Sequence, residues 1–523
     1  MSRLGRSNGG RVTAALIALA LAAVAGFALL AGDDGSAGGE TTARPNIVLI
    51  VTDDQTMEQF TRRTMPETTR IVADEGTSFS RYWVTTAVCC PSRATMLTGQ
   101  YAHNHEVLSN PAGYPALVDR ENTLPAWLSR AGYTTAHVGK YLNGYGEVDG
   151  LGRGPGWDVW RTAFGPMFYD FNVVGTDGEK TRFGFGEEDH FTTVANQIAS
   201  QQARELGERE EPFYLQIDHR APHTEGQPES GGRCSGLSIP APRDEELFAD
   251  ATSPRVPSFD EEDISDKPPF LQGPPLTEGQ LDSLDKRWSC ALASLKEVDR
   301  GVADLERTLG DIGELDDTVI IFTSDNGVFY GQHRIFRGKV LPYADIHHVP
   351  LAMRVPARFL SGPAIESVGV PTANIDLAPT ILELAGAEPC LSERDCRIMD
   401  GRSLLGLIDE SDDSWPAERA LVFEYEDTAK KRYPVCAYSG VLVGADKLTH
   451  HTNAPDESGR CAPQDVYERY DLSRDTYELE NMCHPRCPTD QLQTLLEQRL
   501  DKLRECAGVK GRDPLSAGGV YCE

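Results

Sequence analysis

The sequence predicts an α/β fold, in which a doubly wound, mostly parallel sheet is flanked by helices and followed by a smaller C-terminal α+β subdomain. Two observations predict the sheet: apolar runs of strand length recur along the chain, and they alternate with stretches whose apolar residues follow the helical repeat. A third observation predicts the subdomain, because cysteines become dense and apolar runs become short from about residue 415.

Continuous apolar runs suit parallel strands, because helices cover such a sheet on both faces. The predicted strands are residues 45–52, 134–138, 213–217 and 318–323. The clearest predicted helix covers residues 287–309, and a second, amphipathic helix is predicted at residues 491–506.

Polar side chains follow the carboxyl ends of these strands, which is where ligands bind in open α/β sheets. One polar residue after a strand is an ordinary turn, but several strands that end in metal-ligand or cationic side chains indicate a site. The residues concerned are Asp53, Asp54, Lys140, His223, Asp325 and Asn326.

The formal net charge of the chain is −30. A strongly acidic protein repels nucleic acid, so we expect no nucleic-acid partner. An anionic substrate remains compatible with this charge only where basic residues or a metal ion reverse the field locally.

The N-terminal residues have the pattern of an export signal. Arg3, Arg6 and Arg11 precede an apolar run at residues 12–31. The run is nearly long enough to span a bilayer, and Leu29 is unsuited to cleavage after residue 31, so a signal peptide and a membrane anchor both stay open. Residues 32–44 are predicted to be a flexible linker. We expect the remainder to be secreted or tethered to the outer face of the cell membrane.

The cysteines fit an oxidising compartment, since the chain has 12 of them. Apart from the adjacent Cys89 and Cys90, ten remain, which fit five disulfides between neighbours along the chain, with the connectivity open. A zinc site at Cys483 and Cys487, with His484 as a further ligand, is the alternative for that pair.

The segment from Cys89 to Gly99 carries the most specific pattern. Pro91 suits the first turn of a helix, which places Cys89 at the helix N-terminus, where free N–H groups favour negative charge. Arg93 adds a cation, so a plain cysteine at this position is predicted to be a low-pKa thiolate. The alternatives are an ordinary structural disulfide and a bridge between Cys89 and Cys90.

This segment resembles the signature of the formylglycine-dependent sulfatases, a family of the alkaline-phosphatase-like superfamily. The resemblance covers residues 45–482 and is strongest to the N-acetylglucosamine-6-sulfatase and extracellular heparan-sulfatase branch. The matching segments are Cys89-Cys90-Pro91-Ser92-Arg93 with Leu97-Thr98-Gly99, His103-Asn104-His105, Gly139-Lys140-Tyr141-Leu142-Asn143, Thr323-Ser324-Asp325-Asn326-Gly327, and residues 470–472 with 477–481.

The resemblance implies that a separate formylglycine-generating enzyme oxidises Cys89 to formylglycine (3-oxoalanine). A hydroxyl of its hydrate then attacks sulfur, and sulfate leaves as the carbonyl forms again. Hard oxygen ligands suit Ca²⁺, with Mg²⁺ as the alternative, and disfavour zinc. The implied metal ligands are Asp53, Asp54, the converted Cys89, Asp325 and Asn326.

The family pattern also assigns the remaining catalytic roles. Arg93, Lys140 and Lys339 are expected to hold the sulfate oxygens as charge develops on them. His223, either alone or together with Lys339, is expected to give a proton to the departing alcohol. Many members have a histidine where this chain has Leu142, so the base that regenerates formylglycine is unassigned.

Four further residues are candidates for the substrate cleft. His333 and Asn143 are expected to contact the substrate, although a loop histidine is as often structural. His103 and His105 follow the motif helix and could line the same cleft, or could be structural.

The resemblance implies a sulfatase catalytic domain at residues 45–414, with an insertion or lid at 224–280, and a cysteine-rich C-terminal subdomain at 415–523. The expected activity is hydrolysis of a sulfate ester of a small molecule or glycan, either a sulfated sugar or an aryl sulfate. A phosphonate monoester or phosphodiester hydrolase is the alternative enzyme, since some relatives share the nucleophile and the metal. A catalytically inactive sulfated-glycan-binding protein and a thiol enzyme that uses Cys89 directly are further alternatives.

Overall fold

The computed structural model describes residues 44–148, 150–225, 231–412, 414–416, 418–427, 434–456, 458–515 and 518–523. Residues 45–523 form one compact unit. The predicted signal peptide or anchor, and all of the predicted linker except its last residue, lie outside the described residues. Among the residues described, no helix combines the length and the apolar character that crossing a membrane requires.

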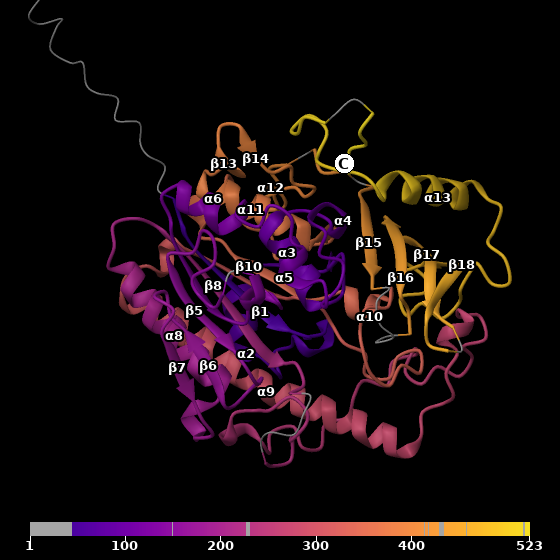
Figure 1. The fold of residues 1–523 in the computed structure, drawn as a ribbon, viewed down its shortest axis with the longest axis horizontal. Helices are drawn as coiled ribbons and strands as arrows, with labels where there is room; N and C mark the ends of the chain where they lie inside the picture. Colours follow the sequence, from indigo (N-terminus) through magenta and orange to yellow (C-terminus); the bar gives the residue numbers. More distant parts are fainter. Residues whose placement is uncertain are drawn as a thin grey trace, which may run out of the picture. The chain divides into compact units, whose positions relative to one another are not determined.

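A ten-stranded sheet lies at the centre of this unit (Figure 1). The strands from β9 to β5 run parallel, whereas β10 is antiparallel to β9 and β6 is antiparallel to β5. The predicted doubly wound, mostly parallel sheet is therefore confirmed, with antiparallel strands at its flanks. In spatial order the strands are β11 (Ser367–Val368), β2 (Thr77–Phe79), β10 (Leu351–Arg354), β9 (Thr318–Ser324), β1 (Asn46–Asp53), β8 (Phe213–Pro222), β4 (Thr134–Gly139), β5 (Val159–Phe164), β6 (Phe171–Val174) and β7 (Lys180–Phe183).

Both faces of the sheet are covered, because alternate residues of a strand point to opposite sides. In β1, Ile47, Leu49 and Val51 belong to one apolar cluster, and Val48 and Ile50 belong to another. The first cluster is completed by helices α3 (Cys89–Thr98), α6 (Leu124–Arg130) and α11 (Leu377–Ala385), and the second by α8 (Phe191–Gly207) and α9 (Glu278–Asp311) (Figure 1).

The four predicted strands are β1, β4, β8 and β9, and two elements are longer than the sequence suggested. Strand β8 continues to Pro222. Helix α9 begins at Glu278 because Thr277 caps it: the Thr277 side chain accepts a hydrogen bond from the Gln280 backbone N–H, and the Gln280 side chain reaches back. This capping pattern precedes the apolar repeat from which the helix was predicted.

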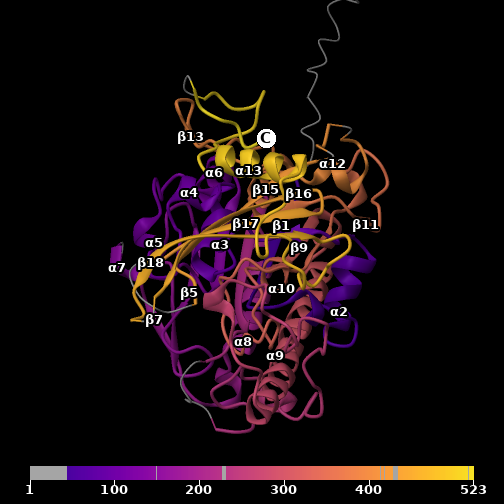
Figure 2. The ribbon, with the colours of Figure 1, turned by 90° about the vertical axis from the view of Figure 1, so that its right-hand side faces the viewer.

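The C-terminal part contains a four-stranded antiparallel sheet, and helix α13 (Gln491–Leu503) packs on it against β16 and β17 (Figure 2). Leu421, Tyr438 and Leu448 of this sheet belong to the same apolar cluster as one face of the central sheet. The predicted α+β character is confirmed, while a boundary at residue 415 stays a prediction. The strands are β15 (Ala420–Glu426), β16 (Ala437–Val443), β17 (Asp446–Pro455) and β18 (Cys461–Asp471).

Ten cysteines form five disulfides, and each bond joins neighbours along the chain, as predicted. The pairs are Cys234–Cys290, Cys390–Cys396, Cys436–Cys461, Cys483–Cys487 and Cys506–Cys522. The zinc alternative at Cys483 and Cys487 is wrong, because both sulfur atoms are engaged in a disulfide. Cys89 and Cys90 are free thiols, so the alternative bridge between them is wrong as well.

The described residues of the predicted insertion have little regular structure before α9 begins. They contain the short helices Pro242–Asp244 and Pro269–Leu271 and are tied to α9 by the bond between Cys234 and Cys290. The other short elements are Met57–Gln59, α2 (Pro66–Thr68), Thr69–Asp74, β3 (Tyr82–Trp83), α4 (Ala102–His105), α5 (Gly113–Ala116), α7 (Tyr145–Val148), Glu187–Asp189, Leu315–Asp317, α10 (Ala344–His347), Ala357–Phe359, β12 (Thr372–Ala373), Asn374–Asp376, β13 (Cys390–Ser392), β14 (Asp395–Cys396) and α12 (Leu405–Ile408).

Candidate active site

The carboxyl ends of the central parallel strands meet at one edge of the sheet. Strand β1 is in register with β8 and β9, so that Asp53 lies opposite Pro222 and Thr52 lies opposite Ser324. The next residues of these strands are therefore neighbours in space, although the chain separates them widely. The predicted convergence of polar side chains at this edge is what the register produces.

Helix α3 brings Cys89 to this edge. Pro91 lies in the first turn of the helix, and Gly99 ends it with a φ of 67°. Cys89 is a buried thiol whose Sγ donates to Asp53 Oδ1 at 3.3 Å. Lys339 Nζ donates to the same sulfur at 2.9 Å.

The thiol of Cys89 is not the thiolate that the sequence suggested. Burial raises its pKa to about 11, with the Asp53 carboxylate acting in the same direction, and Lys140 and Lys339 do not offset them. The helix N-terminus is surrounded by protein, so desolvation of a charged sulfur outweighs the favourable helix end. The prediction of a low-pKa thiolate is therefore wrong.

Carboxylates from β1 and β9 surround the cysteine. Asp54 accepts from Asn326 Nδ2 at 2.5 Å, and the Asp54 backbone N–H donates to Asp325 Oδ1 at 3.2 Å. One ligand atom from each of Asp53, Asp54, Cys89 and His223 lies within 4.8 Å of the others. The structure thus places all five predicted metal-ligand positions in one buried cluster.

The carboxylates are crowded, and their pKa values diverge. Burial opposes the ionisation of Asp53, but Lys140 and then His223 and Arg93 outweigh it and hold the pKa of Asp53 well below its usual range. Burial and the neighbouring Asp53 carboxylate raise the pKa of Asp325, even though Arg93 opposes them. A bound cation would relieve this repulsion between buried carboxylates.

The donor atoms fit a hard divalent cation. Asn326 is fully buried, and its Oδ1 has no hydrogen-bond partner among the described residues. A buried polar atom without a partner is costly, and a metal ion would satisfy it. Carboxylate and amide oxygens are ligands that Ca²⁺ and Mg²⁺ prefer.

Three cations converge on the same cluster. Lys140 Nζ donates to Asp53 Oδ2, and Lys339 Nζ donates to Asp54 Oδ1. Burial alone would lower the pKa of both lysines, but these carboxylates raise it, so both stay charged. Arg93 is 4% exposed, and its Nη2 is buried without a partner among the residues described, which leaves it able to donate to a ligand.

Asp218 is a member of this network that the sequence did not reveal. It is 1% exposed and accepts from Arg93 Nη1 at 2.5 Å, while Asp325 accepts from Arg93 Nε at 2.8 Å. Asp218 also accepts from His137 Nε2 at 3.0 Å and from Gln216 Nε2 at 2.8 Å. The signal for it was a polar residue in a buried strand, at the same face as Gln216, where apolar side chains are the norm.

The ring of His223 is oriented by its own loop. Its Nδ1 lies 2.6 Å from the carbonyl oxygen of Thr224, which can only accept, so Nδ1 carries a hydrogen. Its Nε2 lies 3.6 Å from Asp54 Oδ2. The ring therefore turns its second nitrogen toward the cluster and is about a quarter exposed (28%).

The comparison with known protein families agrees with this geometry. The family model described as Sulfatase matches residues 45–387, and the model for the C-terminal part of N-sulphoglucosamine sulphohydrolase matches residues 331–506. The chain belongs to the sulfatase family. Members of this family are sulfuric ester hydrolases.

Curated relatives of this sulfatase include members of the predicted branch. A putative extracellular sulfatase Sulf-1 homolog of Caenorhabditis elegans is 34% identical over 69% of this chain, which spans 49% of that protein's length. The N-acetylglucosamine-6-sulfatase of Homo sapiens is 29% identical over 90% of this chain and 87% of its own length. The predicted resemblance to that branch is confirmed.

Solved structures share the sulfatase fold. A structure described as BT4656 in complex with its substrate D-glucosamine-2-N,6-O-disulfate superposes with a TM-score of 0.66 at 22% identity, over 88% of this chain and 97% of the other. The phosphonate monoester hydrolase of Agrobacterium radiobacter superposes with a TM-score of 0.60 at 20% identity, over 88% and 95%. At these identities the likeness establishes the fold alone.

Two residues of this sulfatase were expected to contact the substrate, His333 and Asn143. No interaction among the described residues connects either of them to the cluster of metal-ligand positions and cations. His333 is buried, with Nδ1 2.6 Å from Glu261 Oε2, and it stacks on Tyr343. Burial opposes its charge, but Asp345 and Glu261 raise its pKa to about 9. Asn143 is exposed, and its role, like that of His333, stays a prediction.

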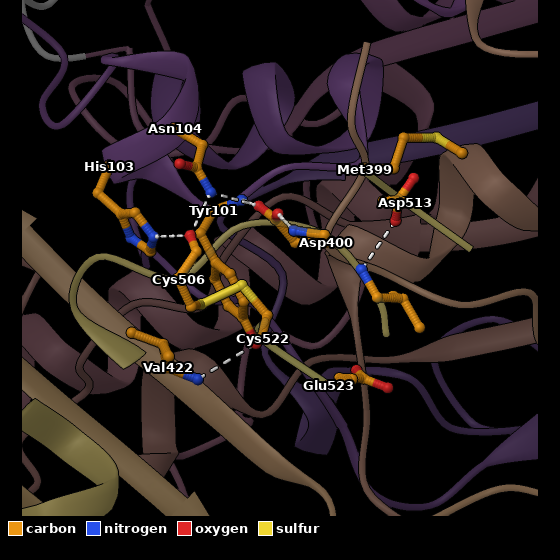
Figure 3. The surroundings of a disulfide bond; sticks show 12 residues. Tyr101, His103, Asn104, Met399, Asp400, Val422, Cys506, Asp513, Cys522 and Glu523 are labelled. Carbon is orange, nitrogen blue, oxygen red and sulfur yellow. Dashed lines mark hydrogen bonds between the residues drawn. A yellow bond between two sulfur atoms is a disulfide. The ribbon is translucent and has the colours of Figure 1, made fainter. Parts of the chain in front are cut away.

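His103 joins the motif segment of the sulfatase to the C-terminal tail. His103 Nε2 and Asn104 Nδ2 both donate to the Cys506 carbonyl, at 3.0 and 2.8 Å (Figure 3). His103 Nδ1 also lies 2.9 Å from Glu424. His105 is fully buried beside Thr95, at 3.0 Å. Both histidines thus have structural contacts, the second of the two roles considered for them.

Proposed function

We propose that this chain hydrolyses sulfate esters of sulfated sugars, with aryl sulfates as artificial substrates, through a formylglycine made from Cys89 and a bound divalent cation. The observation that carries the proposal is the convergence of Cys89 with Asp53, Asp54, Lys339 and Arg93 in one buried cluster. The hydrate of the converted residue supplies a hydroxyl nucleophile for sulfur, and Ca²⁺, or alternatively Mg²⁺, supplies Lewis acidity.

The residues of the chain have complementary roles in this reaction. Arg93 Nη2 and Lys339 Nζ donate to sulfate oxygens, on which charge increases as the ester bond breaks. Lys140 holds Asp53 ionised. His223 Nε2 gives a proton to the departing alcohol, and its partner Thr224 fixes the ring for that transfer.

Export and maturation complete the proposal. Five disulfides suit an oxidising compartment, and the C. elegans relative is named an extracellular sulfatase. We infer that the chain is secreted or tethered outside the cell, and that a formylglycine-generating enzyme acts on Cys89. The substrate of the structural neighbour is a sulfated glucosamine, which supports a sulfated sugar as the substrate here.

A phosphonate monoester or phosphodiester hydrolase is the second candidate, because a phosphonate monoester hydrolase shares this fold. An inactive sulfated-glycan-binding protein has less support, because a binding role requires neither the free thiol nor the lysine contact to it. Both candidates are decided by the same experiment.

The test is expression of the full chain with and without a formylglycine-generating enzyme. The mass of the tryptic peptide that ends at Arg93 reports conversion of Cys89, and sulfate release from an aryl sulfate reports activity. We expect conversion and calcium-dependent sulfate release together, and loss of both in Cys89→Ala. The matched control is Cys90→Ala, which keeps the motif and should retain both.

Two outcomes would overturn the proposal. Conversion of Cys89 with turnover of phosphonate or phosphodiester substrates alone would establish the second candidate. A persistent thiol at Cys89 in the presence of the maturation enzyme would leave the binding protein as the better account.

A further inference from the structure

Val340, the residue after the catalytic Lys339, has a strained backbone conformation. Its φ is 74°, in the left-handed region, where an L side chain crowds its own backbone and a β-branched one does so most. Among the described non-glycine residues with a positive φ, Val340 alone is β-branched. Such a conformation persists only where neighbouring contacts impose it. The strain therefore points to contacts that also act on the position of Lys339.

Val340 and Lys339 both contact the start of the motif helix. The Val340 N–H donates to the carbonyl of Ala87, two residues before Cys89, at 3.3 Å. Lys339 Nζ donates to Cys89 Sγ at 2.9 Å. A different φ at Val340 would rotate Lys339 relative to the residues that follow. If those residues are fixed, the left-handed conformation is what keeps Lys339 on Cys89.

The residues after Val340 are held by the C-terminal part of the chain. Lys447 of β17 donates through Nζ to the Pro342 carbonyl. Glu478, which follows β18, accepts from the Ala344 backbone N–H at 2.6 Å. Lys447 also donates to Glu478, so the two side chains form one ion pair. This pair therefore fixes the backbone two and four residues after the strained position.

Tyr343, between these two points, is held by the same sheet. Its hydroxyl donates to Glu468 Oε1 at 2.9 Å, and its ring stacks on His333 with 4.3 Å between the ring centres. Glu468 is 1% exposed and also accepts from the Tyr470 hydroxyl at 2.7 Å. Three consecutive residues of the segment thus each contact the C-terminal part.

Stability alone is a poor explanation for the ion pair. Lys447 is 2% exposed and Glu478 is fully buried. Burial raises the pKa of Glu478, although Lys447 opposes this. A buried pair loses the hydration of both charges, so apolar side chains of similar size often serve stability equally well. Its distinctive property is its position, because both members end on backbone groups of the segment that follows Lys339.

We propose that Lys447 and Glu478 are positioning residues, which hold Val340 in its left-handed conformation and thereby keep Lys339 beside the nucleophile at Cys89. The inference rests on the proposed function and gives the C-terminal sheet a part in the reaction. The left-handed penalty of an L residue corresponds to a factor of about ten in population. Without the ion pair, we expect Lys339 to be in place in about one tenth of the molecules.

Glu478→Gln tests the pair, because it keeps an acceptor for the Ala344 N–H but removes the charge. We expect kcat/KM for an aryl sulfate to fall about tenfold, at equal conversion of Cys89 as measured by peptide mass. The matched control is Glu297→Gln. Glu297 of α9 is also buried, at 2% exposed, and pairs with two arginines, and its substitution should leave kcat/KM unchanged.

A second substitution distinguishes positioning from stability. Glycine adopts the left-handed conformation without penalty, so Val340→Gly in the Glu478→Gln chain should restore kcat/KM to within about threefold of wild type. It should do so while lowering stability further, because a buried side chain is lost. Val340→Ala removes nearly the same side chain but keeps the penalty, so it should restore nothing. Should Glu478→Gln fail to fold, Lys447→Met removes the pair with its apolar stem retained and should show the same loss and recovery.

Three results would overturn the inference: wild-type kcat/KM in the variants of the pair, a loss that glycine does not recover, or equal recovery by alanine. Hydrogen exchange separates this failure from that of the proposed function. Faster exchange of the peptide that contains residues 339–344 in Glu478→Gln, beside a wild-type rate in Glu297→Gln, supports the positioning contacts even in a chain that releases no sulfate. An unchanged rate contradicts them regardless of activity.

Discussion

Asp218→Asn tests whether the buried carboxylate behind Arg93 positions that guanidinium for sulfate. The substitution keeps an acceptor oxygen but removes the charge, so a charge-assisted hydrogen bond becomes a neutral one. That change costs about 1–2 kcal/mol of folding free energy. Asp218→Ala would instead leave Arg93 and His137 unpaired at one side, at a cost of about 3–5 kcal/mol. Asp218 is 1% exposed, so water cannot replace the lost partner.

Asp218→Asn should lower catalytic activity as well as stability. A guanidinium that is held less firmly loses a similar free energy in the transition state, so kcat/KM should fall about tenfold. Urea denaturation gives the stability, and aryl sulfate hydrolysis gives kcat/KM after the Cys89 peptide mass has been matched to wild type. Restoration of part of the activity by Asp218→Glu would support a positioning role.

Asp299→Asn is the matched control for this prediction. Asp299 is also buried, at 2% exposed, and accepts from Lys296 at 3.1 Å and from the Thr68 backbone N–H at 2.8 Å. It should lose comparable stability with unchanged kcat/KM. Equal loss of kcat/KM in both variants, or wild-type kcat/KM in Asp218→Asn, would refute the positioning role.

Three further predictions concern the C-terminal tail. Burial opposes the charge of His103, but Glu424 raises its pKa to about 9. His103→Gln should therefore lower the free energy of unfolding by about 3 kcal/mol below pH ~6.5, and this loss should vanish as pH rises through 9. Urea denaturation at both ends of this pH range measures the change. Burial raises the pKa of Asp400 to about 6, so between about pH 4 and 6 the folded state binds a proton that the unfolded state has lost. The free energy of unfolding of the wild type should therefore fall by up to about 3 kcal/mol as pH rises over this range. Asp400→Asn should show a smaller dependence of that free energy on pH. Replacing both Cys506 and Cys522 by serine opens a bond of sequence separation 16 and should cost about 3 kcal/mol in the same assay; an unchanged midpoint would contradict this.

The parts of the site that the sequence predicted are those set by strand periodicity. Asp53, Asp325 and Lys140 directly follow or end buried parallel strands, and strand register alone brings such positions to one edge. Cys89 was identified from a local motif at a helix start, which also depends on near neighbours in sequence. Local rules therefore sufficed for these residues.

The missed features depend on contacts between distant segments. The pKa of the Cys89 thiol is raised by burial and by Asp53, 36 residues away in sequence, so a rule based on the helix end gave the wrong direction. His333 is paired with Glu261 of the insertion, a partner that no local pattern indicates. Asp218 lies inside β8, which continues beyond the predicted strand end at residue 217, and its partners Arg93 and His137 come from distant segments.

The charges of the cluster explain how such an acidic chain can admit a sulfate ester. Leaving aside the transferable proton of His223, the four buried carboxylates outnumber the three other cations, which leaves one net negative charge. The carboxylates are Asp53, Asp54, Asp218 and Asp325, and the cations are Arg93, Lys140 and Lys339. A divalent cation changes the sign to one net positive charge, which a singly charged sulfate ester then neutralises.

This balance predicts that removing the divalent cation weakens binding as well as catalysis. Calorimetry on the Cys89→Ala variant, which cannot turn over, should show that a chelator lowers the affinity for a sulfated sugar, and that added Ca²⁺ restores it. The effect should be larger for the sulfated sugar than for the same sugar without sulfate, because the neutral sugar does not experience the change of sign. Equal affinity for the sulfated sugar with and without the cation would show that Arg93 and the two lysines alone reverse the field, and that the metal acts on the reaction step.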